Sequence, residues 1–251
     1  MNRIINFFRA SIHALFLFIT LVPWTVVALL TSVFASGTTM YWVCQRWLKL
    51  SIDAAEAILG ISKRIHGFEN LPLAEKAPAI ILVKHQSLWE TFAMPAVLPH
   101  PLAYVFKREL NYIPFFGWVI ASMDMIYIDR KQGAQSFQKM VDQGTRLLAN
   151  GTWVILFPEG TRIPRGETGK YKTGGTRLAI ATGAPVIPVA VSSAKCWPKK
   201  AFIKTPGVID ISIGKPIPSI GREPGELMAE VEAWIEAEMR RLDPEAYTNK
   251  Q

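Results

Sequence analysis

The positions of charged residues divide the chain into two unlike parts. No Asp, Glu, Lys or Arg occurs from Ala10 to Gln45, and Pro23 and Gly37 lie within this apolar run. One membrane-spanning helix needs about 20 apolar residues, and two need about 40 with a turn between them. The run is therefore long for one helix and short for two.

Basic residues flank the apolar run on both sides. Arg3 and Arg9 precede it, and four more follow it: Arg46, Lys49, Lys63 and Arg64. A single span usually carries its Lys and Arg residues mainly on one side. The pattern favours a re-entrant or monotopic helical element that dips into the cytoplasmic leaflet. The alternatives are a single span and a cleaved signal peptide with its cleavage site near Val33–Phe34–Ala35.

The segment from Met40 to Ile61 has the pattern of an amphipathic helix at a membrane interface. It places apolar residues among charged ones: Trp42, Trp47, Leu50, Ala54, Ala57 and Ile58 among Arg46, Lys49, Asp53 and Glu56. We therefore assign residues 1–64 to an N-terminal, helical, membrane-associated element.

After Gly67, short apolar runs alternate with helical patterns. The expected strands are Ala79–Val83, Ala103–Phe106, Met125–Ile128, Trp153–Phe157, Val186–Val191 and Val208–Ile213. The clearest helices are Ala134–Ala149 and Gly225–Leu242. This alternation predicts an α/β domain over residues 65–251, with a mixed, largely parallel central sheet flanked by helices. Functional residues in such sheets gather at strand ends.

The net charge of +8 and the isoelectric point near 9.5 indicate an anionic partner. No nucleic-acid-binding motif is present, so anionic lipid headgroups are the expected partner rather than nucleic acid. The segment Lys195–Lys204 mixes basic and aromatic residues, which suits either a membrane interface or a solvated loop. The two cysteines, Cys44 and Cys196, provide neither a disulfide framework nor zinc-ligand spacing.

Residues His85 and Glu90 are a candidate base and carboxylate. His85 comes just after the apolar strand that ends at Val83, which would expose it at a strand end. Five residues along a continuous helix turn through about 140°, so a turn is needed to bring Glu90 to the imidazole. A carboxylate there would orient His85 and stabilise its protonated form. The alternative is a loop histidine with a structural hydrogen bond.

Two further strand ends carry groups suited to phosphate. Lys107 and Arg108 follow one strand, and Phe157–Pro158–Glu159–Gly160–Thr161–Arg162 follows another. Arginine binds phosphate in a bidentate manner, and a Pro/Gly turn brings the backbone close to a ligand. Lys172 comes shortly afterwards. Taken singly, each cluster is also explained as a solvated charge pair or an ordinary turn.

Taken together, these motifs resemble the glycerolipid acyltransferase family. The resemblance covers roughly residues 65–220 and rests on a His-four-residues-acid motif, a basic block after a strand, Phe-Pro-Glu-Gly-Thr-Arg, and the strand Val186–Ile187–Pro188–Val189. The six-residue motif is highly specific. This chain departs from the family in having Glu90 where an Asp is usual, and Ile163 where a Ser is usual.

The resemblance implies an enzyme that transfers a fatty acyl group to the 2-hydroxyl of 1-acyl-sn-glycerol-3-phosphate. His85 would be the base and Glu90 its partner. The phosphate-binding residues would be Lys107, Arg108, Glu159, Gly160, Thr161, Arg162 and Lys172. No metal and no cofactor are implied; an acyl-CoA or an acylated acyl carrier protein would be the co-substrate. The expected location is the bacterial inner membrane, with the catalytic domain on the cytoplasmic face.

Three other interpretations remain open at this stage. The first is the same chemistry on another acceptor: glycerol-3-phosphate, another lysophospholipid or a lyso-aminolipid. The protein would instead be a non-catalytic, anionic-lipid-binding protein if the fold serves only as a scaffold. A secreted or periplasmic enzyme would result from signal cleavage.

Overall fold

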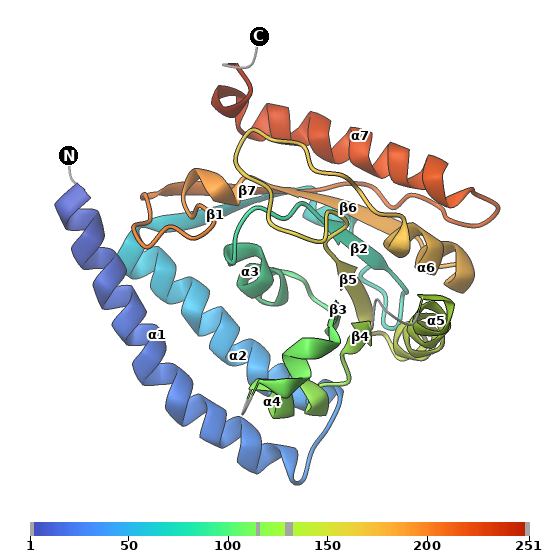
Figure 1. Cartoon of the computed structure of the whole chain (residues 1–251), viewed down its shortest axis with the longest axis horizontal. Coiled ribbons are helices and arrows are strands. Elements are labelled where there is room, and N and C mark those ends of the chain that lie inside the picture. The colour runs from blue at the N-terminus through green and yellow to red at the C-terminus, as the bar shows by residue number, and fades with distance from the viewer. Residues whose placement is uncertain (1–2, 114–115, 129–132, 249–251) are drawn as a thin grey trace.

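The computed structural model describes residues 3–113, 116–128 and 133–248 and contains a seven-stranded sheet at its centre (Figure 1). The strand order is β1-β7-β6-β2-β5-β3-β4. The strands are β1 (Ile61–His66), β2 (Ile80–Val83), β3 (Leu102–Lys107), β4 (Ile126–Ile128), β5 (Trp153–Leu156), β6 (Val186–Val191) and β7 (Gly207–Ile213).

Among the described strands, only one neighbouring pair, β6 with β7, is antiparallel. The five strands from β6 to β4 run parallel to one another, and β1 pairs in parallel with β7. The mixed, largely parallel sheet expected from the sequence is therefore confirmed. The carboxyl ends of β2, β3 and β5 lie at the same edge, where the candidate residues are found.

All six expected strands are present, each with bounds within one residue of those expected. The strand β1 was missed, because Ser62, Lys63 and Arg64 interrupt any apolar run and β1 lies at the sheet edge. It begins at Ile61, inside the segment 1–64 that the sequence analysis assigned to the membrane element. The division of the chain near residue 64 stays a proposal, and the sheet itself takes in the last residues of that segment.

The helices of the described residues cover both faces of the sheet (Figure 1). They are α1 (Arg3–Ser32), α2 (Thr38–Ala54), α3 (Trp89–Val97), α4 (Phe116–Ser122), α5 (Gly133–Ala149), α6 (Gly174–Thr182) and α7 (Pro224–Leu242). A π-helical turn, η1 (Ala55–Leu59), extends α2. Short 3₁₀ turns are η2 (Phe68–Asn70), η3 (Arg108–Tyr112), η5 (Ser193–Lys195) and η6 (Pro244–Ala246).

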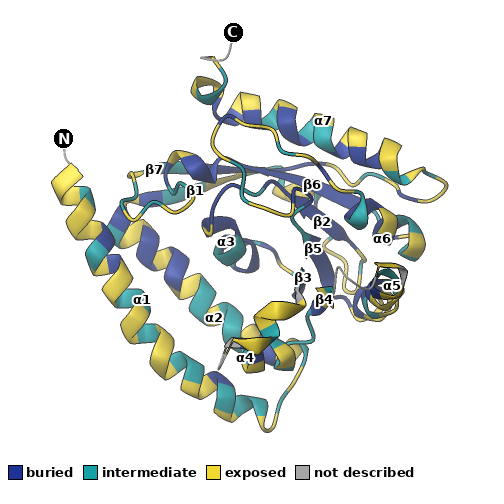
Figure 2. Ribbon diagram, viewed as in Figure 1, coloured by how far each residue is buried: buried dark blue, intermediate teal, exposed yellow. Residues whose placement is uncertain are grey.

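The charge-free run forms most of α1, a turn, and the start of α2. Helix α1 is long and apolar enough to cross a membrane by length and composition, and most of its surface is exposed (Figure 2). It is tied to α2 by hydrogen bonds from Trp24 Nε1 to the Val43 carbonyl (3.0 Å) and from Trp47 Nε1 to Thr20 Oγ1 (3.1 Å). The re-entrant, spanning and signal-peptide interpretations of this run remain predictions.

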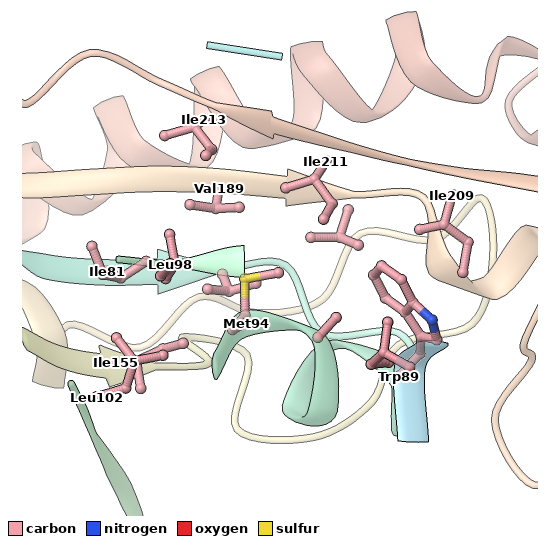
Figure 3. Close-up of a cluster of buried hydrophobic side chains, with 14 of the residues drawn as sticks. Ile81, Trp89, Met94, Leu98, Leu102, Ile155, Val189, Ile209, Ile211 and Ile213 are labelled. Atoms are coloured by element: carbon pink, nitrogen blue, oxygen red, sulfur yellow. The ribbon is translucent and has the colours of Figure 1, made fainter. Parts of the chain in front are cut away.

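Two apolar cores fix the sheet between its helices. One face of the sheet packs against α2, η1 and α3 through residues such as Ile81, Val189 and Ile211. Figure 3 shows part of this core, with Trp89 and Met94 of α3 directed toward the strands. The other face packs against α5, α6 and α7. Because strand side chains alternate between faces, successive residues of β2 belong to opposite cores.

Candidate active site

His85 lies at the carboxyl end of β2, in a loop that leads into α3. The ladder continues one residue past the strand, since the Lys84 N–H donates to the Val189 carbonyl (2.9 Å). Alternation then directs Lys84 to the face covered by α7 and His85 away from it. His85 is half-buried, whereas Lys84 is fully buried. The side chains of Lys84 and His85 therefore point to opposite faces of the sheet, and that of His85 is the more exposed of the two.

The turn after β5 holds the His85 backbone on both sides. The His85 N–H donates to Glu159 Oε2 (2.9 Å), and the His85 carbonyl accepts from the Ile163 N–H (2.8 Å). The imidazole stacks on the Phe157 ring, with centroids 3.9 Å apart and planes 18° apart. Two of the three strand-end motifs therefore meet at His85. The contact at Ile163 uses the backbone, so it survives the replacement of the usual Ser.

The surroundings of His85 keep its imidazole neutral. Burial, together with the positive charges of Arg162 and Lys199, lowers the pKa of His85 to about 4. Its Nδ1 atom is buried and has no hydrogen-bond partner among the described residues. A neutral imidazole is able to accept a proton at pH 7, which a general base requires.

Glu90 does not orient the imidazole in this structure. It lies in the first turn of α3, and its carboxylate accepts hydrogen bonds from the N–H groups of Gln86 (2.6 Å) and Ser87 (3.0 Å). The Ser193 hydroxyl adds a third donor at 2.8 Å. Burial raises the pKa of Glu90 to about 7, although these hydrogen bonds act in the opposite direction. Glu90 thus fixes the loop that carries His85.

Glu159 is also buried, and both of its carboxylate oxygens are engaged. Oε2 accepts from the His85 N–H, and Oε1 accepts from Lys84 Nζ (2.7 Å). Burial raises the pKa of Glu159, and the charge of Lys84 opposes this shift. This environment differs from the phosphate contact expected from the sequence, and it suits a residue that supports His85.

The remaining expected phosphate residues lie in different places around His85. Arg162 is half-buried and close enough to His85 to affect its pKa, whereas Thr161 is exposed. Gly160 has a φ of 65°, which glycine adopts without strain. Lys107 ends β3, but its side chain lies outside the described residues; Arg108 begins η3 and is exposed.

A cleft of about 380 Å³ opens beside His85. Strand ends supply Val105, Phe106, Ile128, Leu156 and Phe157, and α5 supplies Ser136, Phe137 and Met140. Gly160, Lys172, Gly174 and Gly175 complete its wall on the side of α6. The lining of the cleft is mainly apolar and includes the polar side chains of His85, Ser136 and Lys172, which suits an amphiphilic ligand.

The sequence analysis missed several residues of this region. Lys84 directly precedes His85, and its burial follows from strand alternation, a signal that was present. Lys199, which donates from Nζ to the Arg162 carbonyl (2.9 Å), belonged to a segment interpreted only as interface or loop. Ser193 and Glu236 are distant in the sequence and gave no local signal. Within the described ranges, no cluster of His, Cys, Asp or Glu could hold a metal ion.

Taken together, an α/β sheet with a neutral histidine and an arginine at its carboxyl edge defines a candidate acyl-transfer site. Residues 62–192 match the family described as Acyltransferase, so the chain belongs to that family. The match includes His85, Glu90 and the 157–162 turn. The family expected from the motifs is therefore confirmed.

Individual relatives share a narrower name. The chain is 41% identical over 206 residues to the 1-acyl-sn-glycerol-3-phosphate acyltransferase of Pseudomonas aeruginosa, covering 81% of this chain and 79% of that one. It is 29% identical over 162 residues to the human 1-acyl-sn-glycerol-3-phosphate acyltransferase beta, covering 64% of this chain and 58% of the human one.

A solved structure shares the fold. The crystal structure of the 1-acyl-sn-glycerophosphate acyltransferase from Thermotoga maritima matches with a TM-score of 0.75. The match covers 95% of this chain and 98% of that chain, at 22% sequence identity. The similarity therefore extends through the N-terminal helices as well as the sheet.

Proposed function

We propose that this protein transfers a fatty acyl group from an acyl thioester to the 2-hydroxyl of 1-acyl-sn-glycerol-3-phosphate, giving phosphatidic acid. The observation that carries this proposal is the neutral His85, set between Arg162 and an apolar cleft. The name shared by the relatives at 41% and 29% identity supports it.

In this proposal, His85 takes the proton from the acceptor hydroxyl as that oxygen attacks the thioester carbonyl. The tetrahedral intermediate then collapses, the carbon–sulfur bond breaks, and the leaving thiolate takes the proton from the His85 imidazolium, which regenerates the neutral base. The phosphate of the acceptor would lie near Arg162 and Lys199. Because those two charges lower the pKa of His85, a bound dianion would offset them and raise its basicity. Binding of the substrate phosphate would thus raise the pKa of His85 and make it a stronger base.

The hydrogen bonds that hold the backbone of the His85 loop supply the positioning that this reaction needs. Holding a base and an alcohol in reactive geometry can contribute several kcal/mol to the lowering of a barrier. Glu90 and Glu159 would act in this way, by fixing the loop on which His85 is carried. Arg108, Gly160, Thr161 and Lys172 are proposed as further contacts to the polar part of a substrate, together with Lys107.

We place the enzyme at the membrane, where both acyl-bearing molecules partition. The single long apolar helix of the described residues, α1, suggests membrane association. The bacterial relative suggests the inner membrane, with the site on the cytoplasmic side, where acyl-CoA and acyl carrier protein are found. The donor is proposed as one of these two thioesters.

The direct test is acyl transfer by purified protein in detergent. Wild type should form phosphatidic acid from lysophosphatidic acid and an acyl-CoA or acylated carrier protein. His85→Ala should lower kcat by roughly 10²–10⁴-fold, the usual cost of a lost general base. His100→Ala is a matched control, because that histidine stacks on Trp153, away from the cleft. Full turnover by His85→Ala would contradict the assigned base.

The acceptor is tested in the same assay. Glycerol-3-phosphate, other lysophospholipids and a lyso-aminolipid replace lysophosphatidic acid one at a time. Faster turnover of any of these would move the proposal to that acceptor while keeping the chemistry. Folded wild type with no product from any acceptor would reject the enzyme itself.

A further inference from the structure

Lys84 lies at the centre of a buried ionic cluster beneath His85. Its side chain is fully buried, and Nζ donates to Glu159 Oε1 and to Glu236 Oε1, each at 2.7 Å. The Glu167 carbonyl accepts a third hydrogen bond at 3.2 Å. All three donor positions of the ammonium group therefore have acceptors.

The second carboxylate, Glu236, comes from α7 and is itself held in place. The Tyr171 hydroxyl donates to its Oε1 and the Thr168 hydroxyl to its Oε2, both at 2.8 Å. Because Glu159 Oε2 accepts the His85 N–H, an unbroken chain of contacts runs from α7 through Lys84 and Glu159 to His85. Helix α7 lies beyond residue 192, where the match to the family ends.

Stability alone gives little reason for such a cluster. A buried ion pair costs much of its attraction in desolvation, and well-packed apolar side chains are often as stabilising. The cluster also holds one cation against two carboxylates. The charges instead add geometric specificity, because charge-assisted hydrogen bonds fix the positions of their partners more strictly than apolar contacts do.

We propose that Lys84 and Glu236 are positioning residues for the base. Lys84 sets the orientation of Glu159, Glu159 fixes the backbone of His85, and Glu236 anchors Lys84 to α7. None of the three residues lines the cleft beside His85. The kinetic part of this inference rests on the proposed acyl transfer, whereas its structural part does not.

The decisive variant is the double substitution Lys84→Met/Glu236→Gln. It removes one cation and one anion together, so the formal charge of the cluster is unchanged. Glu159 Oε1 then loses its partner, and the His85 loop should loosen. Small misplacements of a reacting group can cost about 10²-fold, so kcat should fall by that order while KM for lysophosphatidic acid changes little.

Hydrogen–deuterium exchange supplies a readout that needs no turnover. A peptide covering residues 84–88 should exchange faster in the double variant than in wild type, while peptides from β6 stay protected. Glu236→Gln alone, which keeps the Lys84–Glu159 pair, should give a smaller change in the same direction. Glu232→Gln, one turn earlier on α7 and half-exposed, should leave both exchange and kcat unchanged.

The outcomes separate the two proposals. Unchanged exchange at residues 84–88 in the folded double variant, or in Glu236→Gln if the double variant does not fold, overturns the positioning role. So does a lowered melting temperature with an unchanged kcat. Absence of acyl transfer by wild type would reject the proposed function instead, and the exchange measurement would still decide the role of Lys84 and Glu236.

Discussion

His85 and Glu90 occupy the places of a base and its partner in the sequence motif, yet the expected contact between the two side chains is not formed. The Glu90 carboxylate is taken up by the N–H groups of Gln86 and Ser87 and by Ser193. Glutamate is one methylene longer than the usual aspartate, and its carboxylate here caps the loop before its own helix. The catalytic roles of both residues stay predictions, and the structure gives Glu90 a contact that supports the loop.

The pKa of His85 is a direct test of its environment. We expect its imidazole to titrate near pH 4 rather than at the ordinary value of 6.5, because burial and the charges of Arg162 and Lys199 disfavour the imidazolium. In Arg162→Gln the pKa should rise, since one of those charges is lost. Proton NMR of the four histidines, with the His85 signal identified by its loss in His85→Gln, measures both values.

The sign of the linked stability follows from the same pKa. The folded pKa of His85 lies below the unfolded value, so protonation favours the unfolded chain. The contribution of His85 to stability is present above about pH 6.5 and is lost as the pH falls toward 4. A His85 signal that titrates at 6.5 in wild type would contradict the buried, cation-flanked site.

At the scale of elements, hydrophobic pattern predicted six strands and missed the one with a polar surface. Strand β1 carries Lys63 and Arg64, and Arg64 pairs with Asp210 on β7 (2.7 Å). An edge strand held by its partner's backbone and by a cross-strand ion pair needs no apolar run. Only the pairing with β7, which is more than 140 residues away, makes it a strand.

The turn after β1 depends on glycine at position 67. Gly67 has a φ of 74°, and a Cβ there would overlap the carbonyl oxygen of Ile213 at the end of β7. Gly221 has nearly the same φ, 73°, but open space around it. Gly221→Ala should cost about 1–2 kcal/mol of unfolding free energy through strain alone, and Gly67→Ala distinctly more. Denaturant unfolding of both variants in detergent measures the difference.

Equal losses in the two variants would show that the β1–β7 end relaxes freely around an added methyl group. That result would remove the close approach of Gly67 to Ile213 as a determinant of the sheet edge. A loss at Gly67 larger than at Gly221 would support it.

At the scale of the whole molecule, α1 contributes little to the two cores, which include Ala10 of this helix. Its large apolar side chains are exposed along much of its length, including Leu15 (58%) and Phe18 (69%). Near its start, Phe7 contacts Phe202, and Lys204 lies over the ring of Trp197 at 4.9 Å. The basic and aromatic segment 195–204 is thus beside α1, as an interfacial loop would be.

Charges placed on α1 should weaken membrane binding without unfolding the protein. Leu15→Glu/Phe18→Glu introduces two anions at exposed apolar positions. The free-energy cost of moving these charges out of water therefore arises only when α1 enters lipid. Flotation with vesicles of phosphatidylglycerol and phosphatidylcholine should show reduced binding. Ala229→Glu/Ala233→Glu adds the same charge at exposed positions of α7 and should bind as wild type does. Equal binding by both variants would argue against α1 as the membrane-contacting element.

The parts of the candidate site that could be predicted are those whose residues are close together in the sequence. His85 and the turn from Glu159 to Arg162 were found because each follows an apolar strand. The cluster of Lys84, Glu236 and Tyr171 joins segments 65 to 152 residues apart. Local hydrophobic periodicity carries no information on contacts between residues so far apart in the sequence. Only the packing of α7 on the sheet reveals this cluster.

The exposed apolar surface of α1 also determines how the rate of this enzyme has to be expressed. If acceptor and product stay in the same lipid layer as α1, encounters take place in two dimensions. The relevant concentration is then the mole fraction of acceptor in the layer, not moles per litre of suspension. Diluting the layer with an inert lipid would slow the enzyme even though nothing in the test tube had become less concentrated by volume.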